Sequence, residues 1–197
     1  MISWFFISLI ITILLTPGPT NTLLASSGIE SGVKKSLKLI PAEAIGYLLA
    51  ISAWGILIES IADSFPFIPP ILKLLSASYI VFLAIKLWKT SCMDTDMHQP
   101  LITPKALFYA TLLNPKALLF ASAIFPASSW NSLASYAMHM GTFLGLILPI
   151  AVFWIFLGSI LISNRIAWLN QKNLKRTASL ILISFSIPLS YSALTSL

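Results

Sequence analysis

The sequence contains very little charge. Asp, Glu, Lys and Arg make up only 9% of its 197 residues, whereas 57% are hydrophobic. An ordinary soluble domain has about 25% charged residues. Residues 2–15 and 146–162 contain no charged residue at all. This scarcity excludes a water-soluble globule and predicts an all-α integral membrane protein whose solvent is the lipid bilayer.

Cysteine and catalytic motifs are scarce as well. The single cysteine, Cys92, cannot form a disulfide within the chain, and no Cys/His cluster has metal-site spacing. The expected spans contain no Ser/His pair, no paired aspartates and no H-E-x-x-H motif, so no nucleophile has an evident base. The basic residues form no stripe with interleaved aromatics, which disfavours a nucleic-acid partner. We therefore expect no enzyme activity, no metal site and no cofactor.

Six apolar blocks have about the 20 residues that a helix needs to cross a bilayer core. We expect six transmembrane helices, near residues 2–28, 41–61, 67–87, 106–126, 136–162 and 177–196. Ten of the twelve basic residues lie in or beside the connections after the first, third and fifth blocks. Because short cytoplasmic loops are rich in Lys and Arg, this pattern predicts that both termini lie on the outer face of the membrane, which is the periplasm for a protein of the bacterial inner membrane.

A polar stretch divides the chain into two halves of three spans each. Residues 93–104 are expected to form a cytoplasmic linker between a first repeat, 1–92, and a second repeat, 105–197. An odd number of spans per half makes the second half enter the membrane from the opposite face, as in an inverted repeat. Proline interrupts the first span of each half, so we expect broken first and fourth helices.

The first break exposes backbone polar groups within a span. Pro17 and Pro19 lack an N–H group, so the carbonyl oxygens of Ile13 and Leu15 are expected to lose their helical partners. Gly18 allows the chain to bend. Unsatisfied groups cost several kcal/mol in hydrocarbon, so irregular backbone persists there only where protein, water or a ligand satisfies it.

The helices that resume after the breaks begin with free backbone N–H groups, which can bind an anion such as a carboxylate. Thr20 or Asn21 is expected to cap the helix that resumes after the first break. At the second break, Asn114 is the expected cap, Pro115 takes the first helical position, and Lys116 adds a full charge. Two alternatives stay open: a structural kink without a ligand, and Lys116 as an interfacial anchor.

Several short motifs occur in a specific order. They are TPGPTN at 16–21, GVKK at 32–35, LKLLSASY at 72–79 and LNPKALLF at 113–120. With these motifs the chain resembles the LysE/RhtB family of amino-acid exporters nearly end to end. The resemblance implies a six-helix exporter of amino acids or close derivatives, driven by the membrane gradient, without an ATP site or prosthetic group.

The second span departs from the family pattern, which often has Gly-Asp where this chain has Gly46-Tyr47. Glu43 lies one helical turn from Tyr47 on the same face and can supply the missing acid. It can pair with Lys116, bind a substrate ammonium group or carry the coupling proton. Alternatively, it occupies the first turn of its helix and faces water.

Two further features have open interpretations. The hydroxyl of Tyr79 can bond to substrate or to freed backbone, or its ring can simply pack. Gly141 and Gly145 form a small-xxx-small face suited to close helix contact, either within one subunit or between two copies in a homodimer.

The sequence predicts a secondary transporter that exports an amino acid or a small derivative, coupled to protons, with a zwitterion held between the breaks. A divalent metal-ion exporter and a non-transporting membrane assembly subunit are the alternatives. The expected substrate-binding residues are Pro17, Gly18, Pro19, Asn21, Glu43, Tyr79, Asn114, Pro115 and Lys116.

Overall fold

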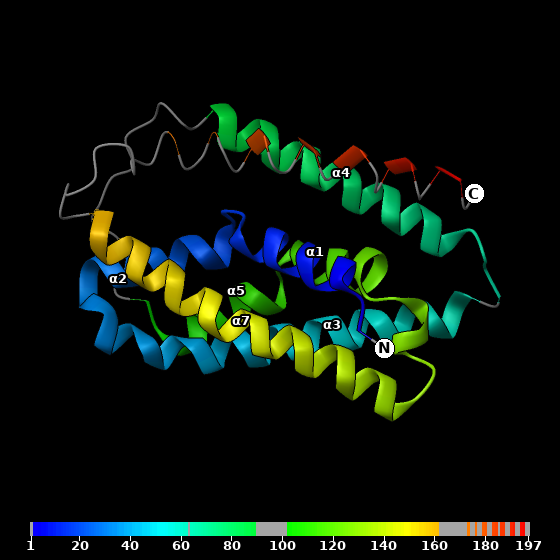
Figure 1. The fold of residues 1–197 in the computed structure, drawn as a ribbon, viewed down its shortest axis with the longest axis horizontal. Coiled ribbons are helices and arrows are strands. Elements are labelled where there is room, and N and C mark those ends of the chain that lie inside the picture. The colour runs from blue at the N-terminus through cyan, green and yellow to red at the C-terminus, as the bar shows by residue number, and fades with distance from the viewer. Residues whose placement is uncertain are drawn as a thin grey trace.

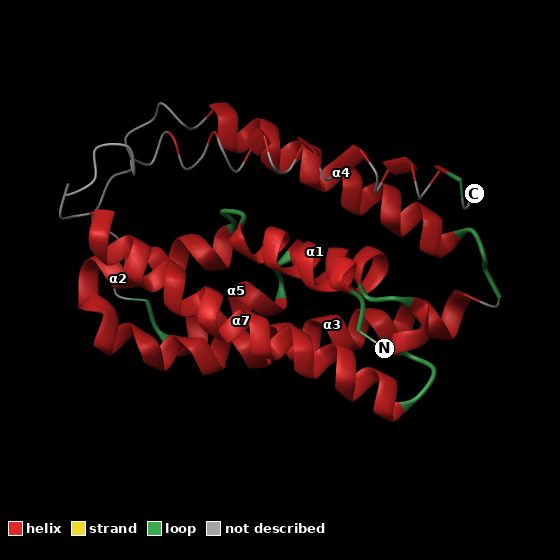
Figure 2. Cartoon of the chain, in the orientation of Figure 1, coloured by secondary structure: helices red, strands yellow, loops and turns green. Residues whose placement is uncertain are grey.

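The computed structural model describes residues 2–62, 64–89 and 102–161, together with scattered positions between 173 and 195. Among these residues the regular structure is entirely helical (Figure 2). The elements are α1 (Trp4–Leu15), α2 (Pro19–Ser36), η1 (Leu37–Leu39), α3 (Ile40–Ala62), α4 (Ile68–Lys89), α5 (Pro104–Leu112), α6 (Pro115–Leu119), η3 (Phe120–Ile124), η4 (Ala127–Ser129) and α7 (Leu133–Leu161).

Long apolar helices dominate the described part of the chain. The stretches Pro19–Ile61 and Leu133–Ile160 are long and apolar enough to cross a membrane, and Pro104–Leu112 with Lys116–Ile124 forms a third candidate span bent by 49°. Pro19–Ile61 is not straight, because Gly32 has φ 74° and ψ 166°, a backbone conformation that favours glycine. The chain reverses near this residue, so α2 and α3 run in opposite directions (Figure 1).

The expected spans agree with the described helices. The broken first span corresponds to α1 and α2, and the broken fourth span to α5 and α6 with η3. The second, third and fifth spans correspond to α3, α4 and α7. Most of the expected sixth span, 177–196, and most of the linker, 93–104, lie outside the described residues. The inverted-repeat arrangement and the repeat boundaries stay predictions.

Glycines permit the close packing of α2 against α7. A Cβ atom on Gly28 would overlap the backbone carbonyl of Ile155, and one on Gly158 would overlap that of Ala25. The two helices therefore approach with backbone almost against backbone, as small residues allow between membrane helices. Both glycines are buried.

The close helix contact expected at Gly141 and Gly145 does not occur among the described residues. No heavy atom lies within 4 Å of a Cβ built on either residue. The small residue that α7 uses against α2 lies about four to five turns further along, at Gly158. A contact between two copies through the Gly141 face stays a prediction.

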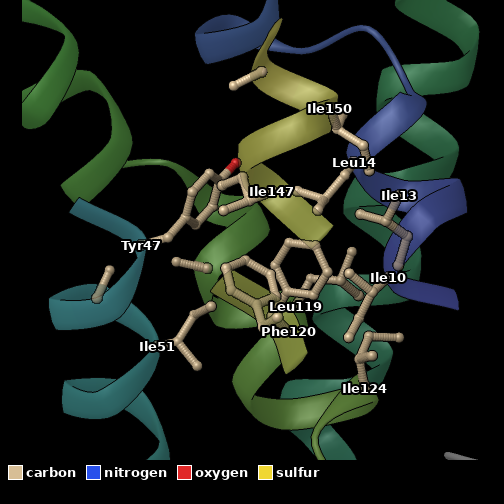
Figure 3. Packing of buried hydrophobic residues seen from close by; sticks show 14 of the residues in the cluster. Ile10, Ile13, Leu14, Tyr47, Ile51, Leu119, Phe120, Ile124, Ile147 and Ile150 are labelled. Carbon is tan, nitrogen blue, oxygen red and sulfur yellow. The ribbon is translucent and has the colours of Figure 1, made fainter. Parts of the chain in front are cut away.

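The apolar core lies between α1, α3, η3 and α7. Phe120 of η3 meets Phe143 of α7 with ring centroids 4.9 Å apart and Tyr47 of α3 at 6.0 Å, both edge to face. Figure 3 shows this cluster, with the Tyr47 hydroxyl pointing away from Ile51 and Phe120. The aromatic rings thus fix the position of Tyr47 and leave its polar end for other partners.

Helix α4 lies at the edge of the bundle, beside the described C-terminal residues (Figure 1). Ser179 is fully buried and donates its hydroxyl to the backbone oxygen of Ala84 over 2.7 Å. This bond fixes the register between α4 and the C-terminal segment at that point.

Substituting Gly158 by alanine should destabilise the protein, whereas Gly141→Ala should not. The new methyl group at 158 forces α2 and α7 apart, at a cost of about 1–3 kcal/mol, or a fall in Tm of roughly 2–10 °C. The Gly141 methyl group enters open space and improves helix propensity. Thermal unfolding of both variants in the same detergent measures the difference. Equal Tm values would contradict the proposed close contact between the helices.

Candidate functional site

The first break separates α1 from α2 as the prolines predict. Helix α1 ends at Leu15, Thr16 is extended (φ −76°, ψ 131°), and α2 begins at Pro19 after an extended Gly18. The helical hydrogen bonds cannot continue from α1 into α2, because Pro17 and Pro19 have no backbone N–H group. The last carbonyl groups of α1 therefore need donors from elsewhere.

Two side chains supply donors to these carbonyl groups. The amide nitrogen of Asn21 donates to the oxygens of Leu14 and Thr16 over 2.6 and 2.8 Å. The indole N–H of Trp154 on α7 also donates to the Leu14 oxygen, over 3.1 Å. Asn21 thus spans the break from its α2 side, and Trp154 ties the break to α7.

The expectation that Thr20 or Asn21 caps α2 is wrong. Gly18 occupies the cap position and makes no side-chain cap bond, and Pro19 takes the first helical position. Because the helix begins two residues earlier than expected, Asn21 lies inside its first turn. From there its side chain satisfies the end of α1 instead of the beginning of α2.

The second break has the expected local structure. Asn114 is the cap of α6, and its side-chain oxygen accepts a hydrogen bond from the backbone N–H of Lys116 over 3.1 Å. Pro115 follows at the first helical position, where a missing N–H costs nothing. The backbone N–H of Asn114 donates to the Thr111 oxygen over 3.0 Å, so that carbonyl group is already engaged.

Lys116 connects the two breaks. Its ammonium group donates to the backbone oxygens of Ile13 and Thr16 over 3.0 and 2.8 Å, and its side chain is 2% exposed. A Cβ atom on Gly18 would lie 2.9 Å from the Lys116 Nζ atom, so glycine leaves the space that the ammonium group occupies. Lys116 is therefore a buried cation held by the end of α1, and the interfacial-anchor alternative is wrong.

The carbonyl groups that face the site differ partly from those expected. Ile13 is confirmed, since its oxygen accepts from Lys116. Leu15 was also expected, but its residue is 40% exposed and the polar side chains of the site instead bond to the oxygens of Leu14 and Thr16. A proline leaves the carbonyl group four residues before it without its helical hydrogen bond, so the sequence identifies which carbonyl groups are freed. The direction of the chain after the break decides which of these carbonyl groups face the site.

Tyr47 and Thr20 belong to the same polar cluster, and the sequence analysis did not include them among the site residues. Asn114 donates its amide to the Tyr47 hydroxyl over 2.9 Å, and the Thr20 hydroxyl lies 3.5 Å from the Tyr47 and Asn114 groups. The signal for Tyr47 was present in the sequence, because it stands where the resembled family often has aspartate.

Glu43 lies within the site. It is 1% exposed, its carboxylate interacts with the Thr20 side chain, and Lys116 is close enough to act on it electrostatically. Gly46 permits this placement, since a Cβ there would lie 2.7 Å from the Thr111 Cβ atom, which brings α3 against α5. The alternative that Glu43 faces water is wrong.

Tyr79 lies outside the hydrogen-bonded cluster. It is half-buried on α4, and its ring packs beside Phe82 with centroids 6.2 Å apart. Among the described residues it donates no hydrogen bond to either break, although it is near enough to Tyr47 to interact electrostatically. A role of Tyr79 in binding substrate stays a prediction.

The cluster is closed to solvent. Its polar members are all at most 4% exposed, namely Thr16, Thr20, Asn21, Glu43, Tyr47, Asn114 and Lys116. A buried cation, a buried carboxylate and open carbonyl groups can together bind both ends of a zwitterion if the helices separate. Within the described residues, no three His, Cys, Asp or Glu side chains are grouped to hold a metal ion.

Comparison with protein families identifies the family of this chain. Residues 11–193 match the model of the LysE type translocator family. The matched range includes both breaks and every residue of the polar cluster. No curated protein and no solved structure gives a significant match to this chain.

Replacing Asn21 by alanine should destabilise the protein by about 1–3 kcal/mol, because it removes two buried hydrogen bonds and leaves the Leu14 and Thr16 oxygens with one donor each, from Trp154 and Lys116. The control is Thr142→Ala on α7, which removes a hydroxyl that only bonds back to Met138 in its own helix. Thermal unfolding in detergent should show a lower Tm for the Asn21 variant alone. A Tm equal to that of the control would contradict the bridging role of Asn21.

Proposed function

The chain belongs to the LysE type translocator family and is a membrane transporter, and from this premise we propose that it exports an amino acid or a small amino-acid derivative. We further propose that the substrate binds between the two breaks and that protons entering the cell drive its exit. The observation that carries the proposal is the buried Lys116 ammonium group, which belongs to one broken helix and bonds to the end of the other.

The substrate carboxylate would bind the Lys116 ammonium group. A lysine has three N–H donors, and within the described residues two of them bond to the oxygens of Ile13 and Thr16. The third is available, and the Asn114 amide and the Tyr47 hydroxyl, which bond to each other, are further donors of the cluster. A carboxylate held by a cation and neutral donors forms stronger hydrogen bonds than a neutral group does.

The substrate ammonium group would replace Lys116 at the end of α1. When a carboxylate draws Lys116 away, the oxygens of Ile13 and Thr16 each lose one of their two donors, and a second cation can take its place. The carboxyl end of a helix favours positive charge, and the buried Glu43 carboxyl group lies nearby as a further acceptor. The ammonium group of a zwitterion can therefore replace the Lys116 ammonium group at these oxygens, while its carboxylate binds Lys116. The buried polar groups then have partners both without and with substrate.

Alternating access would follow from movement between the halves. We propose that residues 1–92 and 105–197 rock about the two breaks, in the manner of inverted repeats joined by the linker 93–104. The bias of basic residues supports cytoplasmic loops after the first, third and fifth spans, and hence a periplasmic location for both termini in the inner membrane. A homodimer is compatible with this arrangement.

Lys116→Met should abolish export while the protein remains folded. Methionine fills a similar volume but cannot bind a carboxylate or donate to the end of α1. The assay is uptake into everted vesicles with an imposed proton gradient, across a panel of amino acids and divalent ions. We expect uptake of at least one amino acid by the wild type and a loss of roughly 100-fold or more in the variant, the order of one charge-assisted interaction or more.

The matched control is Lys105→Met, which removes an exposed lysine from the beginning of α5. It should transport normally, and both variants should be monodisperse in detergent. Unimpaired amino-acid uptake by Lys116→Met would refute its role in binding. Uptake of metal ions alone would favour a metal exporter, and no uptake by the wild type in any condition would favour an assembly subunit.

Glu43→Gln should separate coupling from binding. If Glu43 carries the coupling proton, this variant still exchanges labelled for unlabelled substrate at equilibrium, but a proton gradient no longer drives accumulation. If Glu43 only holds the substrate ammonium group, both activities fall together. The control is Glu59→Gln, which changes an exposed carboxylate near the other end of α3. Proton-driven accumulation by Glu43→Gln at the wild-type rate would exclude both roles.

A further inference from the structure

A groove lies on the outside of the bundle, away from the transport site. It has a volume of about 360 Å³ and runs between α4 and the C-terminal residues beside it (Figure 1). Its lining residues are Ile85, Trp88, Lys89, Ser179, Leu180 and Ile183. The volume is within the roughly 300–1,000 Å³ of small-molecule sites. None of these residues belongs to the polar cluster at the breaks.

The shape of the groove is fixed by spacing and by one hydrogen bond. Ile85, Trp88 and Lys89 lie within one turn of α4, so their side chains share a face. Directly below them, the bond from Ser179 to the Ala84 oxygen holds the C-terminal segment against α4. The groove walls formed by α4 and by the C-terminal segment are apolar except at the end where α4 terminates.

That end of the groove carries positive charge. The Arg176 guanidinium group lies over the Trp88 ring, 5.2 Å from its centroid, and Lys89 is the last residue of α4. The Nε atom of Arg176 is buried and finds no hydrogen-bond acceptor in the described part of the chain. Among the described residues, no carboxylate pairs with Arg176 or Lys89. Two cations and a tryptophan at the end of a membrane helix are typical of the lipid headgroup region.

The apolar part of the groove is open on its outer side. Ile85, Leu180 and Ile183 are 48%, 58% and 43% exposed. In a transporter whose outer helix faces contact hydrocarbon, such side chains meet acyl chains, not water. A ligand that fills the whole groove must therefore have an apolar tail within the membrane and an anionic group at its surface.

We propose that this groove binds one anionic phospholipid, with its phosphate at Lys89 and Arg176 and an acyl chain along Ile85, Leu180 and Ile183. The charge of the rim selects an anionic headgroup over a zwitterionic one. The phosphate would accept hydrogen bonds from the terminal N–H groups of the Arg176 guanidinium and from the Lys89 ammonium group, which are charge-assisted. The site is independent of the proposed substrate and of proton coupling.

Native mass spectrometry of the full chain in detergent tests this proposal. The protein is titrated with phosphatidylglycerol or with phosphatidylcholine of identical acyl chains, and the lipid-bound fraction is measured. We expect tighter binding of phosphatidylglycerol, by about fivefold for each basic side chain that contacts the phosphate. Lys89→Gln/Arg176→Gln should then weaken phosphatidylglycerol binding by roughly 25-fold and leave phosphatidylcholine unchanged.

Two further variants separate the groove from general charge. Lys34→Gln/Lys38→Gln removes two exposed basic residues outside the groove and should leave binding unchanged. Ile183→Trp fills the groove without changing its charge and should weaken the binding of both lipids. Equal binding of the two lipids by the wild type would overturn the proposal. Equal losses in the two charge variants, or normal binding by Ile183→Trp, would overturn it as well.

Discussion

The carbonyl groups at the end of α1 impose the constraint on which the rest of the structure depends. They lie within a broken membrane helix, where water cannot satisfy them and each unpaired group costs several kcal/mol. Their donors come from three different helices: Asn21 of α2, Trp154 of α7 and Lys116 of α6. Satisfying one short stretch of backbone therefore ties together elements from both ends of the chain and brings the second break to the first.

The same arrangement explains why a buried charge can serve transport. A buried ion pair or ion–dipole contact contributes little net stability, because desolvation offsets most of the attraction. The closed cluster around Lys116 is thus held by bonds that can be exchanged for others of similar strength. When Lys116 and the α1 carbonyl groups separate, Lys116 needs an anion and the carbonyl groups need a donor. A zwitterion offers both, through its carboxylate and its ammonium group.

Glycine determines how closely the helices approach in this structure. Gly18 leaves room for the Lys116 ammonium group, and Gly46 lets α3 approach α5 so that Glu43 enters the cluster. Gly28 and Gly158 bring α2 and α7 together, and α7 contributes Trp154 to the first break. Packing and site geometry are therefore coupled, since any side chain at these positions would move a polar group of the cluster.

The sequence alone determined the membrane environment, the helical class, the two breaks and the place of Lys116 at the second break, because charge scarcity and proline act locally and need no knowledge of neighbours. It could not determine which freed carbonyl groups turn inward, or that the Asn21 side chain bonds to the end of α1 instead of capping α2. Those outcomes depend on the rotation of nearly uniform apolar helices, for which sequence periodicity gives no signal. Only the tertiary structure decided them, because backbone polar groups in lipid must find partners on whichever helices pack beside them.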